Sequence, residues 1–132
     1  MMFVLDTNTL IYYFKGMGRV AERLLAHSPQ GIGIPAVVVY ELEVAIAKST
    51  QPEKRQQQLA EMLAVVATLP FGLAEARQAA QIRAALEAVG TPIGAYDVLI
   101  AATALAHGGT LVTHNVQEFD RVAGLPLVDW YT

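Results

Sequence analysis

Short apolar runs alternate with longer segments of helical periodicity along most of the chain. Four apolar runs bounded by turn-forming residues predict strands, at residues 1–5, 32–34, 110–113 and 125–129. Alternating strands and helices favour a parallel sheet, because parallel neighbours need a crossover between them. We therefore predict an α/β three-layer sandwich with a central, mainly parallel sheet, in a single domain over residues 1–132. Pro126 favours an edge position for the last strand.

Apolar residues at helical spacing, with capping residues, Pro or Gly at the ends, predict six helices. They span about residues 8–14, 19–27, 36–48, 52–66, 73–89 and 93–107. Residues 69–71 are predicted as a short extended link and 114–122 as a loop with one helical turn. The inner stripe of the fifth helix is expected to end at Val89. The segment 36–48 is almost wholly apolar, so we expect it to be buried on most sides.

Asp6 closes the first predicted strand. In open α/β sheets, ligands bind just beyond the carboxyl ends of the strands, so Asp6 is placed to offer a carboxylate to a site. Asn8 and Thr9 are predicted to cap the helix that follows. Asp6 has an equally simple structural interpretation as a turn or capping residue, so it identifies no function alone.

Two more acids lie among apolar residues. The residues three and four positions from Asp97 are Ile93, Gly94, Ile100 and Ala101, and those around Glu41 are Val37, Val38, Val44 and Ala45. A buried carboxylate without a partner is costly, and it becomes protonated or finds one. Separate explanations exist, since Asp97 lies near a helix N-terminus and Glu41 could lie at a rim. One divalent cation would explain all three acids together.

The donor chemistry favours Mg²⁺ or Mn²⁺ over Zn²⁺, because the acids offer only oxygen ligands and the chain has no Cys. Three converging carboxylates also repel one another. The pKa of at least one of them should therefore be raised when no cation is bound.

The composition adds two expectations. Hydrophobic residues make up 54% of the 132 residues and charged residues only 16%, against about 25% charged in typical domains, so we expect a permanent interface with another chain. The net charge of −3 gives no overall attraction to nucleic acid, which local basic residues or bound cations would have to supply. With no basic leader and no apolar run of about 20 residues, no signal peptide or membrane span is predicted and a cytoplasmic location is expected.

Four segments carry a family resemblance. They are the Asp-Thr-Asn triplet at 6–8, the segment 38–42 around Glu41, the segment 93–102 around Asp97, and the segment 111–122. In this order and at these spacings they resemble the motifs of PIN-domain ribonucleases, and more narrowly those of the VapC toxins of bacterial toxin–antitoxin pairs. The resemblance covers nearly the whole chain.

The resemblance implies a PIN-domain-like fold and an endoribonuclease whose catalytic water is activated by Mg²⁺ or Mn²⁺. The residues expected to bind this cation are Asp6, Asp97 and Glu41. Asn115 completes the expected catalytic set, although it stands where many PIN domains carry a fourth acid. Its neutral oxygen would hold a second cation more weakly than Asp. Glu118 and Asp120 could compensate for it, or each could be a solvated acid.

Other side chains are expected to support the site. Thr7, Asn8 and Thr113 suit hydrogen bonds that hold the carboxylates in place, although capping and turn formation would explain them as well. His107 and His114 are predicted to be structural, because this mechanism needs no imidazole.

The resemblance also implies partners. An RNA substrate, tRNA or rRNA, would contact basic residues, for which the candidates are Lys15, Arg19 and Arg121. Arg121 could equally pair with an acid of its own loop. A homodimer and a cognate VapB-like antitoxin are expected, with the antitoxin covering the active-site groove. Its contact is predicted on the outer faces of the first two helices and of 36–48.

Two other functions compete with this one. A phosphatase of the haloacid-dehalogenase type needs a second Asp two residues after the first, and Asn8 stands there. A catalytically silent PIN-like module that binds RNA or protein has no need of three desolvated acids, and it stays as the alternative.

Overall fold

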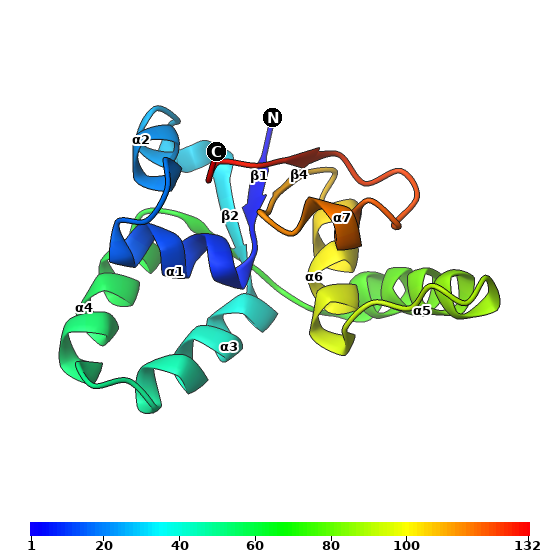
Figure 1. Ribbon diagram of the computed structural model, residues 1–132, viewed down its shortest axis with the longest axis horizontal. Coiled ribbons are helices and arrows are strands. Elements are labelled where there is room, and N and C mark those ends of the chain that lie inside the picture. The colour runs from blue at the N-terminus through cyan, green and yellow to red at the C-terminus, as the bar shows by residue number, and fades with distance from the viewer.

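The computed structural model describes all 132 residues and confirms the three-layer α/β architecture (Figure 1). Five parallel strands form one sheet in the order β3-β2-β1-β4-β5. The strands are β1 Phe3–Leu5, β2 Ile32–Pro35, β3 Ala67–Leu69, β4 Thr110–Val112 and β5 Leu127–Val128. The helices are α1 Thr7–Lys15, α2 Val20–Leu25, α3 Ala36–Ala47, α4 Pro52–Leu63, α5 Leu73–Ala88, α6 Ala95–Ala106 and α7 Val116–Phe119, with a 3-10 turn at Pro29–Gly31. Figure 1 shows α1, α2 and α4 on one side of the strands and α5 and α6 on the other.

The central strand β1 organises both the core and the site. Val4 and Leu5 are fully buried, and so are Leu111 and Val112 in the neighbouring β4. Strands buried on both faces have continuous apolar sequences, which is why these two were predicted correctly. All five strands are parallel, so their carboxyl ends share one edge of the sheet. Helices α1 and α3 begin at this edge, directly after β1 and β2 (Figure 1).

The prediction that the segment before α5 is only an extended link was incomplete. Residues Ala67–Leu69 form the edge strand β3, which pairs in parallel with β2. Ala67 and Thr68 are exposed, so the strand has no apolar pattern to reveal it. Gly33 makes the pairing possible, because a Cβ there would lie 2.8 Å from Leu69 Cδ1.

The prediction that residues 36–48 are buried on most sides was wrong. Helix α3 buries one stripe, formed by Val38, Leu42 and Ile46. Tyr40 and Val44 are exposed. An apolar helix without a polar face gives no signal for which side meets the core, and here α3 presents apolar surface to solvent.

The inner stripe of α5 is shorter than predicted. Ala79, Ile82 and Leu86 are buried, but Val89 follows the last helical residue and is 71% exposed. Glu75 is buried instead, because its Oε1 accepts a hydrogen bond from Gly72 N at 2.8 Å. None of the seven helices combines the length and the hydropathy needed to cross a membrane.

Candidate metal and catalytic site

Asp6 lies at the carboxyl end of β1 and is buried. Its Oδ1 accepts a hydrogen bond from Thr9 N at 2.9 Å, so Asp6 itself caps α1, and the prediction that Asn8 and Thr9 do so was wrong. The cap lies two residues before Asn8 because α1 already begins at Thr7. Burial raises the pKa of Asp6, and hydrogen bonds from Thr113 and Thr9 oppose this only in part.

Glu41 comes to the same edge from the second turn of α3. Its carboxylate is partly buried, and its Oε1 accepts a hydrogen bond from Thr7 Oγ1 at 2.7 Å. The negative charge of Glu41 contributes to the raised pKa of Asp6. Thr7 therefore orients an acid from a helix 34 positions away in the chain.

Asp97 lies in the first turn of α6 and faces the other acids. Its pKa is raised to about 6, first by burial and then by the negative charges of Glu118, Asp6 and Glu41. The predicted rise in pKa is therefore found at two of the three carboxylates. Repulsion by the negative charge of Glu41 is one cause of the rise at both Asp6 and Asp97.

Glu118, from α7, is joined to this cluster. Its Oε1 accepts a hydrogen bond from Gly94 N at 3.0 Å and its Oε2 accepts one from Asn115 Nδ2 at 2.6 Å. These contacts lower the pKa of Glu118, with the backbone of Gly94 as the largest cause. The neighbouring carboxyl of Asp97 also acts on Glu118, and this contact raises the pKa of Asp97 and lowers that of Glu118. Asn115 thus acts on the cluster through Glu118.

Several predicted residues make no hydrogen bond or ion pair with Asp6, Glu41 or Asp97. Asn8 and Asp120 are exposed, and neither side chain makes a hydrogen bond within the protein. Arg121 donates to Pro92 O at 3.1 Å at the rim, where its charge helps to lower the pKa of Glu118. Arg19 forms an exposed ion pair with Glu22 at 2.8 Å, and Lys15 is exposed at the end of α1.

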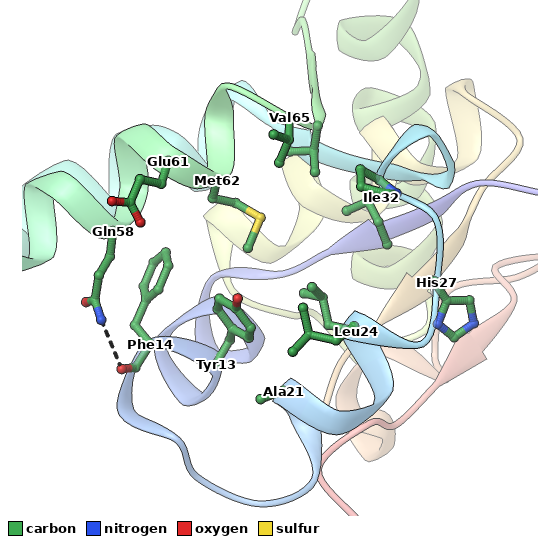
Figure 2. A pocket seen from close by; sticks show the side chains of 13 residues that line it. Tyr13, Phe14, Ala21, Leu24, His27, Ile32, Gln58, Glu61, Met62 and Val65 are labelled. Carbon is green, nitrogen blue, oxygen red and sulfur yellow. Dashed lines mark hydrogen bonds between the residues drawn. The ribbon is translucent and has the colours of Figure 1, made fainter.

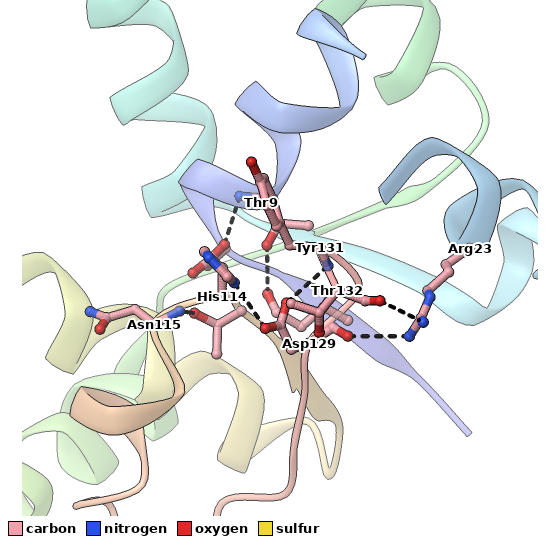
Figure 3. Close-up of polar contacts among 10 residues, drawn as sticks. Thr9, Arg23, His114, Asn115, Asp129, Tyr131 and Thr132 are labelled. Carbon is pink, nitrogen blue, oxygen red and sulfur yellow. Dashed lines mark hydrogen bonds and ion pairs between the residues drawn. The ribbon is translucent and has the colours of Figure 1, made fainter. Parts of the chain in front are cut away.

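The C-terminal segment packs beside the site and was not anticipated from the sequence (Figure 3). His114 Nδ1 lies 2.8 Å from Asp129 Oδ2, and the His114 ring stacks on Tyr131 at 4.3 Å between centroids. Arg23 donates to the carbonyl oxygens of Asp129 at 3.3 Å and Thr132 at 3.1 Å. His107 contacts the buried Glu75 at 3.3 Å, so each of the two histidines has a carboxylate partner, in agreement with their predicted structural role.

The donor set fits a divalent cation. Asp6, Glu41 and Asp97 form no ion pair with any Lys, Arg or His. A Cβ at Gly94 would lie 3.2 Å from Asp97 Oδ2, so the glycine leaves this side of the cluster open. No group of three Asp, Glu or His side chains lies at ligand distance from a common point, so binding of a cation requires the side chains of the acids to move closer together. Oxygen donors of this kind suit Mg²⁺ or Mn²⁺.

The fold and the acid cluster together define a class of protein. Residues 3–125 match the family model of the PIN domain, and the chain belongs to the PIN-domain family. The resemblance inferred from its motifs is confirmed.

Similar proteins narrow the class to VapC ribonucleases. The chain is 35% identical to the tRNA(fMet)-specific endonuclease VapC of Shigella flexneri and 32% identical to that of Salmonella typhimurium, over 97% of both chains in each case. Its structure is similar to DNA-bound VapBC from Salmonella typhimurium, with a TM-score of 0.91 and 33% identity over 98% of each chain. It is also similar to VapBC2 from Rickettsia felis bound to a promoter DNA fragment, with a TM-score of 0.88 and 31% identity over 98% of this chain and 99% of that one.

Proposed function

We propose that this protein is the endoribonuclease toxin of a VapBC-type pair and that it hydrolyses RNA phosphodiester bonds with Mg²⁺ or Mn²⁺. The observation that carries the proposal is the cluster of Asp6, Glu41 and Asp97 at one edge of the sheet, without a basic partner. Relatives that match nearly the full length of this chain are named ribonucleases or endonucleases, and these names support the same reaction.

Three acids are proposed to bind the cation, and neighbouring residues orient two of them. Asp6 and Asp97 offer carboxylates whose pKa is raised chiefly by burial, and Glu41 contributes directly or through a water. Thr7 holds Glu41, while Thr9 N–H holds Asp6, so both acids are oriented before the substrate arrives. When bound, the cation supplies a water of lowered pKa and a positive charge against the phosphate oxygens.

Glu118 extends the negative charge of the site towards α7. Asn115 and the backbone of Gly94 fix both of its oxygens, so Asn115 is a positioning residue in this proposal. Many PIN domains carry a fourth acid at the position of Asn115. In this proposal Glu118 provides part of the negative charge that Asn115, a neutral amide, lacks. Thr113 supports Asp6 from the end of β4.

We infer that tRNA is the RNA to test first, since the relatives from Shigella flexneri and Salmonella typhimurium are named tRNA(fMet)-specific. Lys15 and Arg121 are the basic residues proposed to meet the RNA. The side chain of Arg19 is already paired with Glu22, so it would have to leave that pair to do so.

The antitoxin is proposed to bind an apolar groove beside α1 and α2. Figure 2 shows side chains of α1, α2 and α4 that point into this groove. The groove has a volume of about 520 Å³, and nine of its 13 lining residues are apolar. Leu25 and Val65 of this groove are exposed, which suits an apolar segment of a partner. The exposed apolar face of α3 is the second candidate, and a homodimer would bury further surface of this kind.

The function is tested with purified protein and a tRNA pool. Cleavage is expected with Mg²⁺ or Mn²⁺, is expected to stop with EDTA, and should return when excess metal is added. Sequencing of the new 5′ ends identifies the RNA and the cleaved bond. RNA binding without cleavage under all metal conditions would support the silent binding module instead.

A further inference from the structure

Two exposed tyrosines stand beside the acid cluster, one on each of two helices that supply an acid. Tyr40 precedes Glu41 in α3, and Tyr96 precedes Asp97 in α6. Tyr40 is 53% exposed and Tyr96 is 46% exposed, although both helices bury other residues completely. Packing of the core therefore does not account for either ring.

The two rings form a pair that bridges α3 and α6. Their centroids are 5.7 Å apart with an angle of 53° between the planes, and their hydroxyl oxygens lie 3.3 Å apart. This hydrogen bond raises the pKa of Tyr96, and the negative charge of Glu41 adds to the rise. The pair therefore joins α3 and α6 at the residues that directly precede Glu41 and Asp97 in the chain.

Charge alone is a poor source of RNA affinity at this site. The chain has a net charge of −3, and the acid cluster itself repels phosphate. Of the three basic residues predicted to contact RNA, Arg19 is already paired with Glu22. Stacking of bases on aromatic rings needs no charge, and it requires unpaired nucleotides.

We propose that Tyr40 and Tyr96 stack against an unpaired base next to the scissile phosphate. The inference rests on the proposed ribonuclease function and names the two residues that would hold the nucleotide beside the cleaved bond, which must be unpaired to stack. The adjacent carboxylates then receive the phosphate that follows the stacked base.

The first test separates binding from chemistry. Tyr40→Ala and Tyr96→Ala should each raise KM for a single-stranded RNA by about tenfold, within the roughly 5- to 150-fold that one base stack represents, with kcat little changed. Tyr40→Phe and Tyr96→Phe keep the ring and should retain most of the affinity. Val44→Ala, at an exposed apolar residue one turn further along α3, is the matched control and should leave KM unchanged. The melting temperature of each variant shows that it is folded.

The second test detects stacking without cleavage. A short RNA with 2-aminopurine beside the cleaved bond is titrated into protein carrying Asp97→Asn in Mg²⁺. Stacking should quench the fluorescence, and adding Tyr40→Ala and Tyr96→Ala should abolish the quenching. A fully base-paired version of the RNA should bind and react poorly.

The outcomes distinguish the two proposals. If the wild type cleaves RNA while the alanine variants keep its KM and its quenching, the stacking role is wrong and the ribonuclease function stands. If those variants lose only antitoxin affinity, the pair is a protein-binding site and the inference is overturned. If the wild type cleaves no RNA with either metal, both proposals fail.

Discussion

Ionised Asp97 is proposed to bind the cation, but its ionisation lowers the stability of the metal-free fold. Its pKa of about 6 lies above the ordinary value of 3.8, so the folded state holds its proton more tightly than the unfolded chain does. Stability from this group is therefore fully present below about pH 4 and is lost as pH rises towards 6. At neutral pH without a cation, the ionised carboxylate destabilises the fold.

Asp97→Asn should accordingly stabilise the metal-free protein at pH 7.5. The amide is isosteric and removes the repelled charge. Melting in EDTA should give a higher midpoint for Asp97→Asn than for the wild type at pH 7.5 and a much smaller difference at pH 4. A lower midpoint for the variant at pH 7.5 would show that the charge of Asp97 is not repelled in the folded state.

Thr7 orients one of the three acids, Glu41, through its hydroxyl group. Its hydrogen bond to Glu41 at 2.7 Å is lost in Thr7→Val, which keeps the shape of the side chain. We expect about a 10- to 100-fold loss of metal affinity or cleavage rate, the usual effect of losing such a supporting contact. Thr7→Ser restores the hydroxyl and should recover most of it, whereas equal activity of Thr7→Val and the wild type would remove Thr7 from the site.

At the scale of elements, the central strands and most helices were predictable because their burial patterns are regular. Strand β3 was not, since two of its three residues are exposed and its partner Gly33 carries no side chain. The orientation of α3 was not predictable either, because its apolar residues surround the helix while only one stripe finds a neighbour. In both cases the tertiary packing decides which residues become buried, and the local sequence pattern does not show it.

Gly33→Ala tests the pairing of β3 with β2. The new Cβ would lie 2.8 Å from Leu69 Cδ1 and 3.0 Å from Leu69 Cγ, so Leu69 would have to move within the core. We expect about 1–3 kcal/mol of destabilisation by chemical unfolding, with partial relief when Leu69→Ala is added. Gly31→Ala is the control, since its Cβ would meet only Met1 O at 3.4 Å. A Gly33→Ala protein as stable as the wild type would argue against this register.

For the whole molecule, the sequence located the three acids because carboxylates among apolar neighbours are conspicuous. It did not show that Glu118 would join them and Asp120 would not, since both lie in one short loop and helix. The contacts of Asp129 with His114 and of Tyr40 with Tyr96 join residues 15 and 56 positions apart. Such pairings depend on how the elements pack, which spacing along the chain does not reveal.

The apolar groove predicts how this chain meets its antitoxin. Leu25→Glu places a charge at a groove residue that is 71% exposed, so folding should be unaffected while antitoxin affinity falls by about tenfold or more. Leu73→Glu, at an equally exposed apolar residue of α5 outside this groove, is the matched control. Calorimetry with the cognate antitoxin measures the affinity of both variants. If Leu25→Glu binds the antitoxin as tightly as Leu73→Glu does, the antitoxin does not bind in this groove.

The central claim is that Asp6, Glu41 and Asp97 bind one divalent cation, and calorimetric titration of Mn²⁺ tests it most directly. The wild type should bind Mn²⁺ at pH 7.5, and Asp97→Asn should weaken binding by about tenfold or more, because one anionic ligand becomes neutral. Asp120→Asn, at an exposed acid outside the cluster, should bind as the wild type does. Equal Mn²⁺ affinity in the wild type and Asp97→Asn would contradict the account.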